Sequence, residues 1–176
     1  METPNSGYRG SFKRLILLSD ANVLIDLGYV GGLSLLIQLA PTEVLDVVLL
    51  ECEHERQPEL TRHIEEAGFS VVTTQASWVR QAHSYKAVEL SIQDRLNLLY
   101  AKTYGRVLLA GDKPLRERCE TESVEVHGSL WLVEQAFTRS LVPAHDLCRW
   151  LEVWPSIGRR LPASEIRRLS KLLRCA

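Results

Sequence analysis

Short apolar runs alternate along this chain with longer segments in which apolar residues recur at helical spacing. The run that ends at Ser19 and the run that ends at Ala110 have the length and composition of buried strands, and a helical pattern follows each of them. Because parallel strands need long crossovers, usually helices, this alternation predicts an α/β domain with a parallel sheet. Strands are expected at residues 14–19, 44–50, 69–73, 106–110 and 124–126, and helices at residues 20–28, 33–39, 55–67, 78–89, 91–104, 113–120, 130–139, 144–153 and 163–173.

The length and composition are those of one globular domain. The chain has 176 residues, of which 45% are hydrophobic and 24% are charged. It contains no apolar run of the roughly 18 residues that indicate a transmembrane helix, and its first residues lack the apolar segment of a secretory signal. We therefore expect a flexible leader at residues 1–12, a domain at residues 13–139 and a helical extension at residues 140–176 that packs on the same domain, in a cytoplasmic protein with no membrane partner.

The cysteines and histidines do not form a recognisable metal motif. The chain has no C-x-x-C pair, and its five histidines are scattered rather than paired at the spacing of a zinc site. Reduced and mostly buried thiols are the expected state in a cytoplasmic protein. The four cysteines are Cys52, Cys119, Cys148 and Cys175.

The net charge of −1 hides an uneven distribution of charged residues. Residues 156–174 carry six Arg and Lys residues against one acid, Glu165, so the rest of the chain is acidic. These cations could bind phosphate, which proteins contact mainly with Lys and Arg. They could instead form the solvated face of an amphipathic helix. The apolar stripe of that helix would be Ile166, Leu169, Leu172 and Leu173.

Four carboxylates share one kind of position, at or just past the end of an apolar, strand-like run. They are Asp20, Glu51, Asp94 and Asp112. Ligands of open parallel sheets bind outside the carboxyl ends of the strands, so acids from distant parts of the chain can meet there in one crevice. A crevice of acids without matching bases is expected to hold a hard divalent cation such as Mg²⁺. Each aspartate could instead cap the helix that follows it, and Ser91 has the capping-box spacing to Asp94.

Three of these acids lie in motifs that resemble those of the PIN-domain ribonucleases, a family that includes many toxins of bacterial type II toxin–antitoxin pairs. The motifs are SDANVLIDL at residues 19–27, LSxxD at residues 90–94 and LLAGDKxLR at residues 108–116. They occur in the family's order and spacing, and the likeness runs from about residue 14 to residue 131. The resemblance implies a three-layer α/β fold, with a central and mostly parallel sheet of four or five strands flanked by helices.

The resemblance also implies an endoribonuclease activity that depends on Mg²⁺ or Mn²⁺ held by a cluster of acids. The acids that match the family directly are Asp20, Asp94 and Asp112. Glu51 matches the second acid of the family by its place after an apolar run, and Glu53 and Glu55 lie close enough to be alternatives. The sequence leaves open whether one or two ions bind.

Several neighbouring residues are expected to complete or limit the site. Asn22 matches a polar position beside the first acid, where a side chain can orient a metal ligand. Ala110 stands where the family often has Thr or Ser, which removes one polar group. Asp26 is expected to be a surface acid near the end of its helix. Three basic residues next to the acids are possible phosphate contacts: Lys113, Arg116 and Arg95.

The leading hypothesis is a metal-dependent endoribonuclease that is the toxin of a toxin–antitoxin pair. It implies an RNA substrate, a small antitoxin whose tail covers the acids, and a homodimer. The alternative is a PIN-like binding or regulatory protein with weak or lost nuclease activity, whose extension docks a partner or a second copy. A phosphatase is disfavoured because Asn22 stands where the second acid of a D-x-D pair would be. Trp131, Trp150 and Trp154 lie among Leu and Val, so we expect them in the core or an interface.

Overall fold

A five-stranded parallel sheet forms the centre of the fold. The computed structural model describes residues 15–53 and 55–175, so the expected leader at residues 1–12 lies outside the described residues. The strand order is β3-β2-β1-β4-β5, and every pairing is parallel. The α/β class predicted from the sequence is confirmed. The strands are β1 (Leu17–Ser19), β2 (Thr42–Leu45), β3 (Ser70–Val72), β4 (Val107–Leu109) and β5 (Val126–His127).

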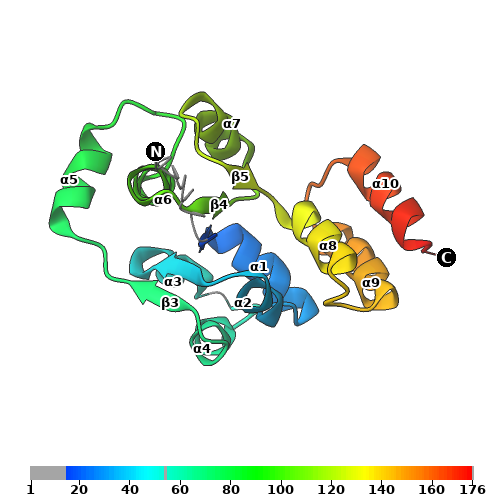
Figure 1. The fold of residues 1–176 in the computed structure, drawn as a ribbon. Coiled ribbons are helices and arrows are strands. Elements are labelled where there is room, and N and C mark those ends of the chain that lie inside the picture. Colours follow the sequence, from blue (N-terminus) through cyan, green and yellow to red (C-terminus); the bar gives the residue numbers. More distant parts are fainter. Residues whose placement is uncertain (1–14, 54, 176) are drawn as a thin grey trace, which may run out of the picture.

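Helices cover both faces of the sheet and make the domain three-layered. The chain passes from β1 to β2 to β3 in one direction, then returns past β1 to β4 and β5. Because parallel crossovers are right-handed, this reversal puts the later helices on the opposite face from the earlier ones. Consistent with this, α1 contacts α3 and α4, whereas α6 contacts α7, and Figure 1 shows α6 and α7 above α1 to α4. These helices are α1 (Ala21–Val30), α2 (Ser34–Leu39), α3 (Asp46–Cys52), α4 (Leu60–Glu66), α5 (Ala76–Ser84), α6 (Ile92–Tyr104) and α7 (Lys113–Thr121).

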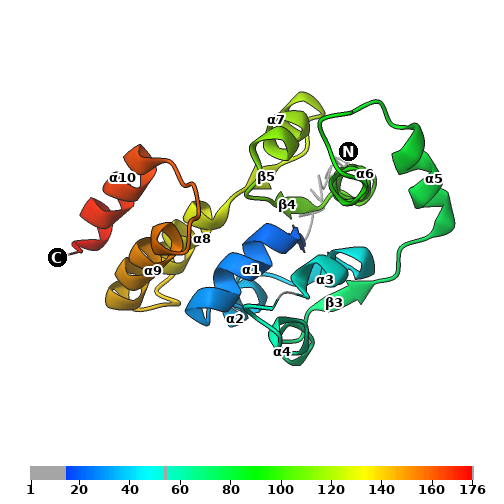
Figure 2. The ribbon, with the colours of Figure 1, turned by 180° about the vertical axis from the view of Figure 1, so that it is seen from behind.

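Three further helices form a C-terminal group beside α1. They are α8 (Ser129–Thr138), α9 (Ala144–Ser156) and α10 (Ala163–Leu173). Figures 1 and 2 show this group packed at the end of α1 that is remote from β1. Trp150 and Trp154 are 3% and 0% exposed, so both belong to the core as expected. Among the described residues, no helix is both long and apolar enough to cross a membrane.

The last helix has the amphipathic character expected from its sequence. Leu169 and Leu173 are buried, whereas Leu172 at the margin of the stripe is exposed. On the polar face, Arg168 donates two hydrogen bonds to the carboxylate of Glu134 on α8, at 2.9 and 3.0 Å, and one to Glu165 at 3.0 Å. Part of the basic segment therefore packs the C-terminal helices together.

The second apolar run is mostly a helix, contrary to the strand expected at residues 44–50. The strand ends at Leu45, and Val47 and Val48 lie in α3. The Asp46 carboxylate accepts hydrogen bonds from the amides of Val47 (2.8 Å) and Thr74 (3.0 Å), which fixes the chain where strand changes to helix. Periodicity cannot separate a short buried strand from a short buried helix in such a run. Glu51 consequently lies in a helix rather than at a strand end.

Several element boundaries also differ from expectation. The first helix continues through Gly28 and ends at Gly31, whose φ of 66° suits glycine. The fourth helix begins only at Leu60, because Pro58 lies within the expected helix at residues 55–67 and Pro is poorly tolerated in a helix interior. The fifth helix ends at Ser84, and the last strand lies at Val126–His127 rather than at residues 124–126.

A disulfide joins Cys148 of α9 to Cys175, just beyond α10, so the expectation of four reduced thiols was wrong for this pair. The two Cα atoms are 5.6 Å apart, although the residues are separated by 27 positions in the sequence. The antiparallel return of α10 along α9 brings them together, which spacing alone does not show. Cys52 and Cys119 are buried free thiols, as expected. Since disulfides are rare in cytosolic proteins, the cysteines no longer support a cytoplasmic location.

We predict that replacing both Cys148 and Cys175 by serine lowers the free energy of unfolding by about 3 kcal/mol, because the cross-link restricts the unfolded chain. Urea unfolding of the two proteins measures this difference. When the two proteins are compared under reducing conditions, this difference in the free energy of unfolding should disappear. Thiol titration of the denatured, unreduced parent should find only Cys52 and Cys119; four reactive thiols would contradict the cross-link.

Candidate active site

The candidate site lies at the carboxyl edge of the sheet, where the direction of winding reverses. The chain leaves β1 toward β2, while β4 lies on the other side of β1. Such a switch point opens a crevice between the loops that leave the two strands, and α/β proteins bind ligands there. Asp20 directly follows β1, and its amide donates a hydrogen bond to the carbonyl of Leu109 at the end of β4 (2.9 Å). The first predicted acid therefore lies at the switch point.

Asp20 is a buried carboxylate with neutral hydrogen-bond donors. The residue as a whole is only 2% exposed. The amide of Asn97 on α6 donates to Oδ1 (3.1 Å), and the amide of Asn22 on α1 donates to Oδ2 (3.4 Å). Asp20 occupies the N-cap position of α1 without a side-chain cap hydrogen bond, although the backbone amides of Ala21 and Asn22 act to lower its pKa. The position expected for Asn22, beside the first acid, is confirmed.

Asn97 was not identified from the sequence and lies next to the first acid. It is completely buried, and its Oδ1 has no hydrogen-bond partner within the described part of the chain. A buried acceptor without a partner costs about 1–3 kcal/mol, so a water molecule or a cation would stabilise this position. The sequence signal was the spacing: Asn97 follows Asp94 by three positions, which puts both on one face of α6.

The charges of Asp94 and Glu51 act on Asp20. Burial raises the pKa of Asp20 to about 7, and the negative charges of Asp94 and then Glu51 add to this effect. The pKa of Glu51 is also raised, by partial burial and by Asp94. Three acids, one directly after β1, one in α3 and one in α6, thus repel one another at one edge of the sheet, and no cation contributes to the shift at Asp20.

Asp94 also caps its helix, so the structural alternative for this residue is confirmed. The Ser91 hydroxyl accepts from the Asp94 amide, and the Ser91 amide donates to Asp94 Oδ2, both at 3.0 Å. The run before Asp94 is a loop rather than a strand. The capping box fixes the carboxylate at the first turn of α6, from which its charge still reaches Asp20. The two roles therefore coexist in one side chain.

Of the candidate glutamates, Glu51 is the one whose charge acts on another of the acids. It lies in the last turn of α3 and contributes to the raised pKa of Asp20, whereas Glu53 lies at the end of the helix and does not contribute to it. Burial, followed by the charges of Asp20 and Glu51, raises the pKa of the adjacent Cys52 thiol to about 12. Cys52 is thus held protonated and is unsuited to act as a nucleophile.

Asp112 lies at the same edge but does not join the other three acids. It occupies the N-cap position of α7 without a side-chain cap bond, is exposed, and contributes to neither raised pKa. Across residues 15–53 and 55–175, no three His, Cys, Asp or Glu side chains lie close enough to hold one metal ion. Metal binding by three or four of these acids would therefore require their side chains to move closer together, and it stays a prediction.

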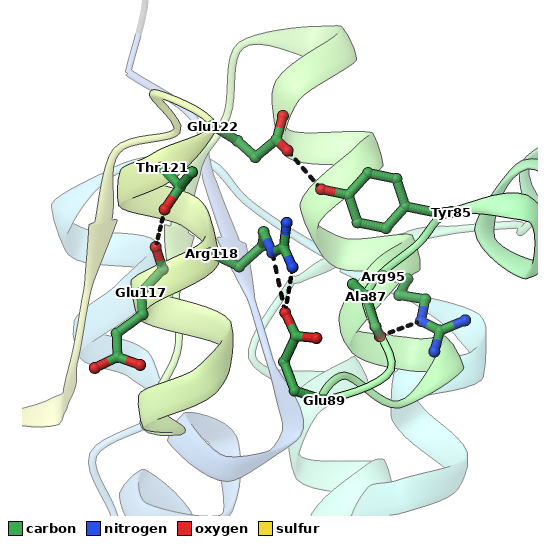
Figure 3. A network of polar contacts seen from close by, with 8 residues as sticks. All are labelled: Tyr85, Ala87, Glu89, Arg95, Glu117, Arg118, Thr121 and Glu122. Carbon is green, nitrogen blue, oxygen red and sulfur yellow. Dashed lines mark hydrogen bonds and ion pairs between the residues drawn. The ribbon is translucent and has the colours of Figure 1, made fainter.

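The three basic residues proposed as phosphate contacts differ in their surroundings. Figure 3 shows the Arg95 guanidinium turned toward the loop before α6, where Nε donates to the Ala87 carbonyl at 3.0 Å. In the same loop, Glu89 pairs with Arg118 of α7, which helps to fix the start of α6. Arg95 is therefore engaged in holding this loop. Lys113 is exposed, with Nζ 3.5 Å from Glu117, and Arg116 packs against Gly128.

Asp26 is buried rather than at the surface, so that expectation was wrong. It is 0% exposed and accepts a hydrogen bond from the Ser129 hydroxyl at 2.7 Å. Arg159, from the loop between α9 and α10, forms an ion pair with it across 133 sequence positions. The C-terminal helices cover this part of α1, which the spacing of residues within α1 does not reveal.

The chemistry of the three interacting acids suits a hard cation. Carboxylate and amide oxygens are ligands that Mg²⁺ accepts, and a divalent ion would offset both the mutual repulsion of the acids and the unpaired Oδ1 of Asn97. If an ion binds, Asp20, Glu51 and Asp94 are the residues that would hold it. Such an ion can shield phosphate charge and supply a hydroxide nucleophile at neutral pH.

Comparisons with known proteins bear on the fold alone. No protein-family model and no curated protein matches the chain. Among solved structures, the crystal structure of PAE2754 from Pyrobaculum aerophilum is similar, with a TM-score of 0.50 and 19% sequence identity, over 77% of this chain and 99% of that one. This likeness agrees with the three-layer α/β architecture.

The raised pKa of Asp20 predicts a pH-dependent stability. Between pH 3.8, the ordinary value, and about 7, the folded protein keeps a proton on Asp20 that the unfolded chain has lost. The free energy of unfolding therefore falls as pH rises through this window, and the loss is complete above about pH 7. Asp20→Asn should remove this contribution and stabilise the metal-free protein at pH 8 by about 1–3 kcal/mol. Urea unfolding of both proteins across this range measures it, and parallel stability curves would contradict the shift.

Proposed function

We propose that the protein is an endoribonuclease that depends on Mg²⁺ or Mn²⁺ and hydrolyses RNA phosphodiesters at the carboxyl edge of the sheet. The observation that carries the proposal is the buried Asp20 at the switch point, whose pKa is about 7 in the presence of two other acids and without a neutralising cation. The resemblance to the PIN-domain ribonucleases supports the same activity, since it matches Asp20 and Asp94 directly and Glu51 by its place after an apolar run. The fold class alone does not specify this activity, because one fold hosts many functions.

The roles of the residues follow from their surroundings. Asp20, Glu51 and Asp94 would hold the ion once their side chains moved closer together, and Asp112 at the same edge would join them if its exposed side chain turned inward. Asn22 and Asn97 donate to the two oxygens of Asp20 and so orient its carboxylate. Ala110 contributes no polar group. None of the described cysteine or histidine side chains is required to act as a covalent nucleophile.

Loss of one ligand should abolish most of the activity, whereas loss of a nearby acid should not. We expect Asp20→Asn and Glu51→Gln to lower the rate of RNA cleavage with Mg²⁺ or Mn²⁺ by about 100-fold or more, since even a residue that only supports a ligand is worth 10-fold to 100-fold. Glu53→Gln is the matched control and should cleave like the parent. Circular dichroism would establish that each variant is folded. Undiminished cleavage by folded Asp20→Asn protein would refute the proposal.

A second candidate, a PIN-like binding or regulatory protein with weak or lost nuclease activity, is favoured by one observation. The described acids do not converge into a ready metal site, and Asp112 stands apart. The extension gives this alternative less support than its sequence suggested, because Trp150 and Trp154 are buried inside the protein. Calorimetric titration with Mn²⁺ separates the candidates: a nuclease should bind the ion in the parent and lose it in Asp20→Asn, and absence of binding in the parent would favour the binding protein.

A toxin role, with an antitoxin and a homodimer, is the finer form of the proposal. An antitoxin tail could place an arginine among the acids, where a bidentate pair with a carboxylate would replace the cation. We expect an adjacent reading frame to encode a small protein, expression of this chain alone to slow growth, and co-expression to restore it. Normal growth on expression of the folded parent would contradict the toxin role. The nuclease activity would still be tested separately by the RNA cleavage assay. Light scattering would test the homodimer.

A further inference from the structure

A buried ion pair connects the C-terminal extension to the sheet domain beside the acids. Asp26 lies in α1, and Arg159 lies in the loop after α9. Arg159 Nη2 donates to Asp26 Oδ2 at 3.3 Å, and Nε lies 2.5 Å from Oδ1 without the alignment of a hydrogen bond. The indole of Trp154 also donates to the Asp26 carbonyl at 2.8 Å. The guanidinium is consequently held in one place by contacts on its inner side.

This pair is a costly way to stabilise the fold. Burial of Asp26 opposes its ionisation, and the contacts from Ser129 and Arg159 only counteract that effect. A buried ion pair of this kind contributes little stability compared with apolar residues of the same size, but it fixes the geometry of its members. Stability alone therefore does not explain why Arg159 is held in one position, and we look for a function of its guanidinium.

The guanidinium is fixed at the edge of the sheet that carries the acids. A Cβ atom built on Gly111 would lie 3.0 Å from Arg159 Nη2 and 3.7 Å from the Cβ of Asn22. Gly111 precedes Asp112 at the end of β4, and Asn22 bonds to Asp20. Arg159 thus reaches the same switch point from outside the sheet domain.

Arg159 retains the capacity to bind an anion there. Its side chain is 28% exposed, and Nη1 has no hydrogen-bond partner among residues 15–53 and 55–175. A guanidinium presents its donors in a rigid fork that suits phosphate, and anchoring it in advance lowers the entropy lost on binding. Of the three basic residues next to the acids, Arg95 is engaged with backbone carbonyls, Lys113 is largely exposed and Arg116 lies against Gly128. None of the three is anchored by a buried acid as Arg159 is.

We propose that Arg159 is a substrate-binding residue of the nuclease site, which holds a backbone phosphate of single-stranded RNA beside the acids while Asp26 positions its guanidinium. The proposal rests on the proposed endoribonuclease function and makes the C-terminal extension part of the active site. A cluster of acids repels a polyanion, and a fixed cation beside it gives the substrate a point of attachment that leaves the acids to the metal.

Arg159→Lys tests the proposal while keeping a cation opposite Asp26. A lysine offers a single ammonium group, which cannot pair with Asp26 and present a second set of donors outward. We expect the free energy of unfolding to stay near that of the parent, while KM for a single-stranded oligouridylate rises about 10-fold to 100-fold, the effect of losing one charge-assisted hydrogen bond. Arg160→Lys, next in the chain and exposed, is the matched control and should leave KM unchanged.

A binding measurement distinguishes phosphate contact from a structural role. In the Asp20→Asn background with Mg²⁺, fluorescein-labelled oligouridylate should bind more weakly to Arg159→Lys, and the slope of log affinity against log salt should become shallower by about 0.7, the value for one phosphate contact. If Arg159→Lys does not fold, the pair Asp26→Asn with Arg159→Gln removes both charges together and should show the same two changes.

The outcomes separate this inference from the function on which it rests. Cleavage by the parent together with unchanged KM and salt slope in the Arg159 variants would overturn the role of Arg159 and leave the nuclease function intact. Failure of the folded parent to cleave or bind RNA with Mg²⁺ or Mn²⁺ would overturn both.

Discussion

The parallel pairing of β1 with β2 on one side and β4 on the other is the constraint on which the rest of the structure depends. It makes β1 the central strand, and the residue that follows it must then lie where the crossovers diverge. The registers of Leu17 with Thr42 and Val107 bring the ends of β1 and β4 together, so the chain has to bury a carboxylate at Asp20 between two loops. An apolar residue there would suit the fold better, which is why the acid points to function.

The helices around this point contribute groups that destabilise the buried Asp20 carboxylate and groups that stabilise it. The start of α6 contributes the charge of Asp94 and the amide of Asn97, one repelling and one stabilising the Asp20 carboxylate. The C-terminal helices pack on α1, where Asp26 is paired with Arg159. Among the described residues, both charged side chains that are buried, Asp20 and Asp26, therefore lie in or next to α1.

The sequence predicted what depends on local patterns. The capping box of Ser91 and Asp94, the helix that ends at Gly105 and the amphipathic stripe of the last helix all follow from residues within a few positions of one another. The acid after the first strand was also identified, because strand ends are visible as the end of an apolar run. By contrast, Val47 and Val48 were assigned to a strand because a short apolar run fits either element, and only packing decides between them.

What the sequence could not predict depends on contacts between distant segments. Asp26 and Arg159 are separated by 133 positions, and Cys148 and Cys175 meet only because two helices return along each other. Asp112 differs from the other acids: it lies at the same edge, but its side chain is exposed just before α7 and does not contribute to the raised pKa of Asp20.

The ionisation of Asp20 itself is the most direct test of a carboxylate poised to receive a cation. Titration of the side-chain carboxyl ¹³C signals by NMR should find an aspartate with a pKa of about 7 in the metal-free protein, absent from Asp20→Asn and moved to lower pH by Mg²⁺. If Asp20 titrated near its ordinary pKa of 3.8 and Mg²⁺ did not change that pKa, the result would contradict a site in which Asp20 is repelled by other acids and binds a cation.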